Sequence, residues 1–215
     1  MNLKERSRVK KIIELLTKEY PGATITLIFE NPLELLIATI LSAQCTDERV
    51  NRVSQSLFKK YKSVEDYARV DLNTFEQEIR STGFYKNKAK NIIDASRKII
   101  KEFGGRVPSE MEDLIVLPGV GRKTANIVLT FAFRKIEGIA VDTHVKRLSQ
   151  RLGLSKNDNP DKIEQDLMEL TPKRYWGKLN SLLIEHGRKI CFARNPLCEK
   201  CALKTICPSF GNFLK

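Results

Sequence analysis

Residues 117–125 read LPGVGRKTA and lie between two segments whose sequence predicts helices, Glu110–Leu117 and Arg122–Phe133. Gly119 and Gly121 permit a tight turn that leaves backbone amides exposed. The helix that follows adds free N–H groups and the positive end of its dipole. We therefore expect a helix-hairpin-helix that binds a nucleic-acid backbone phosphate, whatever the base sequence. The residues expected to make this contact are Gly119, Gly121, Arg122 and Thr124.

Two alternatives to the hairpin are compatible with a glycine-rich turn before a helix. A nucleotide-binding phosphate loop needs a preceding strand and four residues between its first glycine and a Gly-Lys-Thr sequence. Here Arg122 follows Gly121, so that alternative fails. An ordinary helix corner with a glycine turn stays open.

The composition favours a folded, basic protein. Of the 215 residues, 41% are hydrophobic, which is enough for a core and excludes a disordered basic tail. The formal net charge of +12 favours a polyanionic partner, nucleic acid or an anionic membrane surface, although a generally basic solvated surface would give the same number. The longest apolar run, Leu35–Leu41, is far too short to span a membrane. Met1–Lys11 has no apolar core of a secretory signal, so we expect a soluble, cytoplasmic protein, associated with the nucleoid if the source is prokaryotic.

Helical periodicity dominates, and strand signals lack pairing partners, so the predicted fold class is all-α. Asn31 before Pro32 and Asn159 before Pro160 are helix-start signals, each a cap followed by a proline. Composition does not reveal a domain boundary. Besides the two segments that flank residues 117–125, the predicted helices are Leu3–Tyr20, Leu33–Gln44, a helix to Tyr61 capped by Thr46 or Asp47, Val64–Arg69, Leu72–Thr82, Ala89–Phe103, Thr143–Leu152, Pro160–Leu170 and Pro172–Gly187.

Four of the five cysteines gather near the C-terminal end with the spacing C-x6-C-x2-C-x5-C. In an intracellular chain such a group indicates a metal or cluster site rather than disulfides. An iron–sulfur cluster suits the spacing, with Pro208 directly after the last cysteine. A zinc site is the alternative, but zinc more often uses paired CxxC knuckles. The predicted ligands are Cys191, Cys198, Cys201 and Cys207, and Arg194 between the first two is a candidate DNA contact.

Asp142, in the sequence VDTHVKR at 141–147, stands just before a predicted helix, where aspartate is usually a cap. A catalytic role needs a partner, and Lys123 is the candidate. Lys123 lies in the first turn of a helix, whose positive end disfavours the charged form and so favours a free amine nucleophile. A plain phosphate contact is the alternative for Lys123.

Together these motifs resemble the endonuclease III family of helix-hairpin-helix DNA glycosylases and AP lyases. LSAQCTD at 41–47 and STGFYKNKAKNI at 81–92 extend the resemblance, which covers essentially the whole chain. It implies a six-helix barrel domain at 23–135 and a second domain from 1–22 and 136–215 that carries a [4Fe-4S] cluster. It also implies a monomer that acts on double-stranded DNA with damaged bases or abasic sites and has no membrane partner.

The resemblance assigns roles to single residues. Lys123 matches the Schiff-base lysine, and Asp142 matches the catalytic aspartate. Gln44 matches a residue that fills the gap left by a flipped nucleotide, and Phe84 stands where an apolar wedge, commonly leucine, is usual. His144 is a further expected DNA contact. The implied reaction is release of damaged, oxidised pyrimidines followed by nicking through β-elimination.

Some features depart from the family pattern or leave alternatives. Ile115 stands where some members carry a glutamate near the base pocket, so uracil or thymine in mismatches stays possible as a substrate. Cys45 replaces a small residue and is interpreted as a small hydrophobe. An adenine-specific mismatch glycosylase is disfavoured by Lys123 and by the lack of a further domain after Phe210–Lys215. A non-catalytic DNA-binding module would use Asp142 and Lys123 only as a cap and a phosphate contact.

Overall fold

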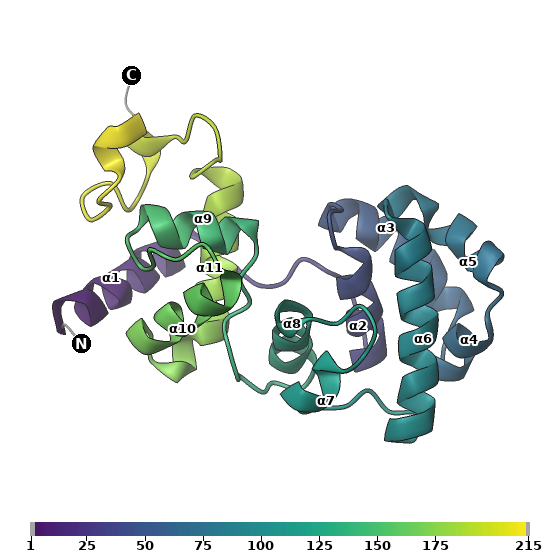
Figure 1. Cartoon of the computed structure of the whole chain (residues 1–215). Helices are drawn as coiled ribbons and strands as arrows, with labels where there is room; N and C mark the ends of the chain where they lie inside the picture. Colours follow the sequence, from purple (N-terminus) through teal and green to yellow (C-terminus); the bar gives the residue numbers. More distant parts are fainter. Residues whose placement is uncertain (1–2, 214–215) are drawn as a thin grey trace. The chain divides into compact units, whose positions relative to one another are not determined.

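The chain is described by a computed structural model over residues 3–213. Within that range it forms eleven α-helices joined by turns and short 3₁₀ segments, with no strand, so the all-α prediction is confirmed (Figure 1). No helix in the described range is long and apolar enough to cross a membrane. The fold divides into two compact units. Unit 1 contains the chain up to Ile25 and from Gly138 onward, and unit 2 contains Thr26–Glu137. Of the expected second domain, residues 1–2 and 214–215 lie outside the described residues.

Unit 2 is built from the seven helices between Thr26 and Glu137. Helix α2 packs against α8, and the long α6 packs against α4 and α5. Nearly all of α2 is apolar and buried, as expected for a central helix. The helices are α2 (Pro32–Leu41), α3 (Asp47–Lys60), α4 (Val64–Arg69), α5 (Leu72–Ile79), α6 (Tyr85–Phe103), α7 (Met111–Ile115) and α8 (Arg122–Ala132), with the 3₁₀ segment η1 (Arg80–Thr82) between α5 and α6.

Side-chain caps explain where several of these helices begin. Asn31 accepts a hydrogen bond from the backbone N–H of Glu34 at 3.0 Å, as its sequence position predicts. Ser63 and Asp66 form a reciprocal capping box at the start of α4. Each such cap satisfies amides that the first helical turn leaves without partners.

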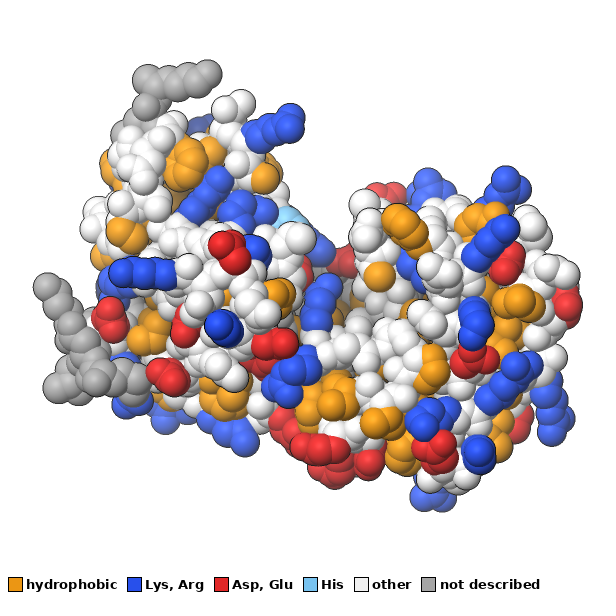
Figure 2. Space-filling model, viewed as in Figure 1, with side chains coloured by type: hydrophobic (Ala, Val, Ile, Leu, Met, Phe, Trp, Pro, Cys, Tyr) orange, Lys and Arg blue, Asp and Glu red, His pale blue; other side chains and the backbone are white. Residues whose placement is uncertain are grey.

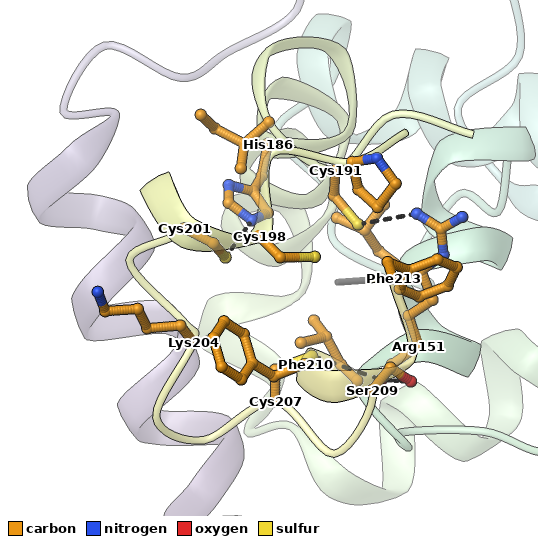
Figure 3. A pocket seen from close by; sticks show the side chains of 14 residues that line it. Arg151, His186, Cys191, Cys198, Cys201, Lys204, Cys207, Ser209, Phe210 and Phe213 are labelled. Atoms are coloured by element: carbon orange, nitrogen blue, oxygen red, sulfur yellow. Dashed lines mark hydrogen bonds between the residues drawn. The ribbon is translucent and has the colours of Figure 1, made fainter. Parts of the chain in front are cut away.

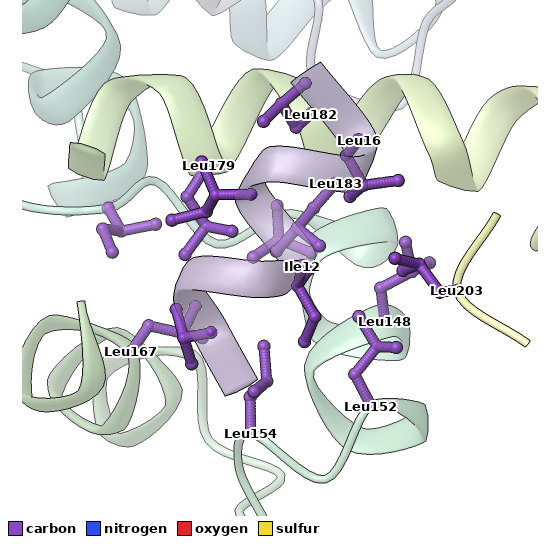
Figure 4. Packing of buried hydrophobic residues seen from close by; sticks show 14 of the residues in the cluster. Ile12, Leu16, Leu148, Leu152, Leu154, Leu167, Leu179, Leu182, Leu183 and Leu203 are labelled. Carbon is purple, nitrogen blue, oxygen red and sulfur yellow. The ribbon is translucent and has the colours of Figure 1, made fainter. Parts of the chain in front are cut away.

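Unit 1 packs α1 (Leu3–Glu19), α9 (Thr143–Arg151), α10 (Pro160–Leu170) and α11 (Trp176–Lys189) around one apolar core (Figure 4). Ile12 and Leu16 of α1 lie against Leu179 and Leu183 of α11 within this core, and all four are fully buried. Leu203 joins the same core from the C-terminal loop. The N-terminal helix is therefore held by residues that follow it by more than a hundred positions in the sequence.

Several helix ends differ from the sequence prediction. Helix α11 begins at Trp176 and not at Pro172, because residues 173–175 form a 3₁₀ segment, and α5 ends at Ile79 where η1 begins. Two further differences lie beside candidate site residues. Helix α2 ends at Leu41 and not at Gln44, because the chain turns at residues 42–45 and Gln44 adopts a left-handed backbone with φ 52°. Helix α6 begins at Tyr85, four residues before the predicted Ala89, directly after Phe84 with φ 49°. Side chains other than glycine, asparagine and aspartate seldom adopt this conformation.

Candidate active site and cysteine loop

The hairpin of unit 2 runs from α7 through residues 116–121 into α8. Gly119 has φ 78°, and a Cβ added there would meet the Asn91 side chain at 2.9 Å, so both the turn and the close approach of α6 require glycine. The backbone N–H of Val120 closes the turn by donating to the Leu117 carbonyl at 3.1 Å. Gly121 precedes α8 and has no side chain, so no side chain caps the first amides of that helix. Amides of this kind can bind a phosphate, so the contact predicted from the sequence stays a prediction that the geometry permits.

Lys123 is the second residue of α8, and its side chain is exposed. No described residue accepts a hydrogen bond from its amine or forms an ion pair with it. Arg122 is exposed beside it, and Thr124 is half-buried. The following Ala125 and Asn126 are buried, so α8 is fixed in the core immediately after its exposed first turn. The helix therefore holds a primary amine in solvent on a rigid support.

Gln44 and Phe84 are both exposed residues of unit 2 that follow a helix end. Phe84 is 63% exposed, so most of this large apolar ring is open to contact by another molecule. Both residues have left-handed backbones, which are strained for these side chains. Strained, exposed positions on short turns are typical of ligand contacts.

Asp142 of unit 1 caps α9. Its Oδ1 accepts a hydrogen bond from the backbone N–H of Val145 at 2.7 Å, and the residue stays half-buried. The structure thus shows the capping role that the sequence suggests, while the second carboxylate oxygen is not used in this cap. Lys123 and Asp142 belong to different units, and each stands at the N-terminal end of a helix.

His144 is partly buried, and the Arg147 guanidinium lies 3.1 Å from its Nδ1. A Cβ on Gly187 would meet the same ring at 2.9 Å, so α11 approaches α9 closely here. Burial lowers the pKa of His144, although the Asp142 charge opposes this shift. The ring is therefore a neutral group packed beside Asp142 on α9.

The four clustered cysteines line one pocket in unit 1 (Figure 3). Apolar side chains, including Leu148, Ile190 and Phe210, complete the lining. The cavity between these side chains has a volume of about 30 Å³. No three potential ligands among the described residues are arranged to hold a single metal ion. Four thiols that line one pocket are nevertheless the donor set of a thiolate-bound metal or iron–sulfur site.

Polar contacts to the sulfur atoms also suit such a group. The backbone N–H of Leu203 donates to Cys201 Sγ at 3.3 Å, and Arg151 donates to Cys191 Sγ at 3.3 Å. The His186 Nε2 atom lies 3.3 Å from Cys201 Sγ, and its other ring nitrogen contacts the Tyr20 hydroxyl at 3.0 Å. Burial raises the pKa of Cys201 to about 11, and a bound cation would favour its thiolate.

Two arginines of α9 hold the cysteine loop, which we define as Cys191–Cys207. Arg151 donates to the carbonyls of Phe192 and Ala193 at 2.7 and 2.9 Å, and Arg147 donates to the Cys191 carbonyl at 3.1 Å. Arg194 is exposed within the same loop. Neither arginine was predicted as a functional residue from the sequence. Their i, i+4 spacing on the helix after Asp142 was the available signal.

Lysine and arginine side chains are spread over the visible face of both units rather than confined to one spot (Figure 2). Several of the acidic residues pair with them, as in Lys90–Asp94 and Lys60–Glu78. The positive surplus therefore acts as a broad field, and specificity must come from the sites described above.

Comparison with known proteins identifies the family. The model of the HhH-GPD superfamily of base excision DNA repair proteins matches residues 37–173. Endonuclease III of Synechocystis is 54% identical over 205 residues, which covers 95% of this chain and 94% of that protein. The chain belongs to the endonuclease III family.

Other members of the endonuclease III family agree. The Bacillus subtilis protein is 45% identical and covers 96% of this chain and 93% of its own length. A solved structure of a trapped endonuclease III–DNA covalent intermediate has a TM-score of 0.93 and 42% identity, covering 99% of each chain. A thermostable thymine-DNA glycosylase is also similar, with a TM-score of 0.86, 25% identity and coverage of 97% and 98%. The resemblance inferred from the motifs is confirmed.

Proposed function

We propose that this chain is a base excision repair DNA glycosylase and AP lyase that acts on duplex DNA, with Lys123 as its nucleophile. The supporting observation is the exposed amine of Lys123, without an ion-pair partner among the described residues, at the start of α8 directly after the hairpin. Family membership supplies the reaction class. A phosphate contact alone would need positive charge there, but it would not need an amine on such a rigid support.

Access to the damaged nucleotide comes first. A base inside a duplex cannot be reached by a nucleophile, so it must be rotated out of the stack. The opened stack then needs replacement contacts. Gln44 and Phe84 supply an amide and a large ring on exposed turns, and the amides at Gly119–Gly121 hold the backbone phosphate. Damaged bases stack and pair less well, which lowers the cost of extrusion and contributes to selectivity.

Bond exchange follows at the sugar. The neutral Lys123 amine uses its lone pair to form a bond to C1′, and the base leaves with the electrons of the glycosidic bond. Loss of the amine proton and opening of the sugar give an imine, which makes the C2′ proton acidic. Removal of that proton breaks the C3′–oxygen bond, and the 3′ phosphate leaves with its electrons. Asp142 would stabilise the positive charge that develops on the sugar and relay protons.

We further propose a [4Fe-4S] cluster held by Cys191, Cys198, Cys201 and Cys207. The thiol chemistry, the pocket and the N–H donors to sulfur support this group. When bound, the cluster cross-links the cysteine loop. This brace would present Arg194 to the DNA backbone, while Arg151 anchors the loop to α9 from within the chain.

The experiment that tests this function uses a panel of defined lesions in duplex DNA, scored separately for base release and strand nicking. The panel contains oxidised pyrimidines, uracil and thymine mismatches, and adenine opposite a damaged guanine. We expect release and nicking at oxidised pyrimidines. Activity at mismatched thymine alone would reassign the substrate, in keeping with the apolar Ile115, which is 42% exposed. Base release without nicking on every substrate would contradict the lysine mechanism.

A further inference from the structure

Lys88 is a buried cation that the reaction described above does not use. It lies on α6, and only 4% of its surface is exposed. Burial lowers its pKa, and no carboxylate among the described residues pairs with it. Lysine is almost never fully buried unless its ammonium has polar partners, because desolvation of the charge is costly.

The partners of Lys88 are two backbone carbonyls from different elements. Its Nζ donates to the Leu41 carbonyl at 2.7 Å and to the Thr82 carbonyl at 2.8 Å. Leu41 is the last residue of α2, and Thr82 is the last residue of η1. Carbonyls at helix ends have no partner within the helix and carry the negative end of the dipole. The ammonium therefore satisfies two helix ends at once.

Both helix ends lead directly into the residues that are proposed to enter the DNA stack. Gln44 follows Leu41 by three residues, and Phe84 follows Thr82 by two. The backbone N–H of Lys88 also donates to the Phe84 carbonyl at 3.1 Å. Lys88 thus contacts the backbone on both sides of the turn at residues 83–84, which we call the Phe84 turn. It joins this turn to the start of the turn at residues 42–45, which we call the Gln44 turn.

The spacing between these two turns matters for the chemistry. Stacked nucleotides of one strand are about 3.4 Å apart, so two side chains that fill one opened step must hold a fixed separation. The left-handed backbones at Gln44 and Phe84 persist only if the surrounding structure holds them. In unit 2, the two hydrogen bonds of Lys88, which we call the Lys88 bridge, tie the residues that precede these turns to each other.

We propose that Lys88 is a positioning residue that sets the separation of Gln44 and Phe84 for opening the duplex. This inference rests on the proposed function, because it assigns a role to residues that act on damaged DNA. It predicts that loss of the bridge impairs steps that need duplex opening and spares the bond exchange at Lys123.

The test compares Lys88→Met with Lys90→Met on two substrates. Methionine has a similar length but cannot donate to the carbonyls, and exposed Lys90 on the same helix is the charge-matched control. The substrates are an abasic site in a duplex, with fluorescent 2-aminopurine in the opposite strand, and the same abasic strand alone. A single strand has no paired stack to open, so nicking of it reports Lys123 chemistry without the turns.

For Lys88→Met we expect a tenfold to hundredfold loss of duplex kcat/KM, since a displacement of about 1 Å can cost about a hundredfold. The 2-aminopurine signal should fall in parallel, while single-strand nicking stays within about twofold of wild type. In a Gln44→Ala, Phe84→Ala background, Lys88→Met should add little, because the coupled residues are already gone. Lys90→Met should retain the wild-type duplex signal.

Equal losses on duplex and single-strand substrates would show a merely structural role and overturn the proposal, as would a wild-type duplex signal in Lys88→Met. If Lys88→Met does not fold by circular dichroism, Lys88→Arg carries the same test. The guanidinium keeps N–H donors for the two carbonyls but is larger than the ammonium, so it changes the distance between them and the same duplex-specific loss is expected. If the wild-type protein nicks neither substrate, the proposed function fails, and this outcome is distinct from failure of the Lys88 bridge.

Discussion

The Oδ1 atom of Asp142 accepts a hydrogen bond from the backbone N–H of Val145 at 2.7 Å, so a proposed catalytic carboxylate also begins the helix on which it stands. The two roles use different properties of the side chain. Capping needs only an acceptor oxygen, whereas stabilising charge on the sugar needs the negative charge. Substitutions can therefore separate stability from activity at this position.

Asp142→Asn should keep the fold and lose the reaction. Asparagine caps as well as aspartate, so the melting temperature should stay near that of the wild type. Activity should fall by about 10²–10³-fold, the usual cost of removing one stabilising group at a developing charge. Asp142→Ala is the matched comparison and should lose about 1 kcal/mol of stability as well. Full activity in Asp142→Asn, measured by nicking rates, would limit this residue to capping.

Gly119→Ala should damage the hairpin, whereas Gly121→Ala should not. Gly119 combines φ 78° with a Cβ position 2.9 Å from Asn91, while Gly121 has φ −96° and open space around its Cβ position. We expect a loss of about 1–3 kcal/mol for Gly119→Ala and less than about 1 kcal/mol for Gly121→Ala in denaturant unfolding. Similar losses of unfolding free energy in the two variants would show that Gly119 is not required by the turn.

The net charge of +12 should make binding to undamaged duplex DNA strongly salt-dependent. Each neutralised phosphate contributes a slope of about −0.9 in a plot of log affinity against log salt. If exposed Arg194 contacts a phosphate, Arg194→Ala should reduce the magnitude of that slope by about one. Fluorescence anisotropy over a salt series measures both quantities. If the affinity of the wild type did not change with salt, the proposed role of the positive charge in DNA binding would be wrong.

The purified protein should be brown and contain iron and acid-labile sulfide. Cys201→Ser should lose the colour, since its thiol lies at a corner of the pocket. Cys45→Ser is the matched control and should keep the colour, because Cys45 belongs to unit 2. Absorbance spectra and metal analysis provide the readout. Stoichiometric zinc in a colourless protein would show that the cluster assignment is wrong.

Local sequence rules predicted much of this fold, because capping side chains and turn glycines determine helix starts and turns through contacts with residues nearby in the sequence. Asn31 and Asn159 cap their helices as expected, and the all-α class is confirmed. The rules failed at Gln44 and Phe84, where nothing in the side chains themselves favours a left-handed backbone. These conformations depend on tertiary contacts, and the burial of Lys88 depends on carbonyls brought from other elements.

The candidate site shows the same division. The cysteine cluster and the hairpin could be predicted from the sequence because the residues of each lie close together along the chain. The anchoring of the cysteine loop by Arg151 was not, because the arginine lies on α9, some forty residues before its partners. Lys123 and Asp142 were linked by family resemblance and not by any local rule.

The central claim, a covalent intermediate on Lys123, is tested most directly by borohydride reduction in the presence of duplex DNA with an abasic site. The exposed side chain of Lys123 makes Lys123→Ala a variant that should fold normally, with a stability change within about 0.5 kcal/mol. We predict a trapped protein–DNA adduct for the wild type and none for Lys123→Ala. No adduct with the wild-type protein, or an undiminished adduct with the variant, would contradict the account.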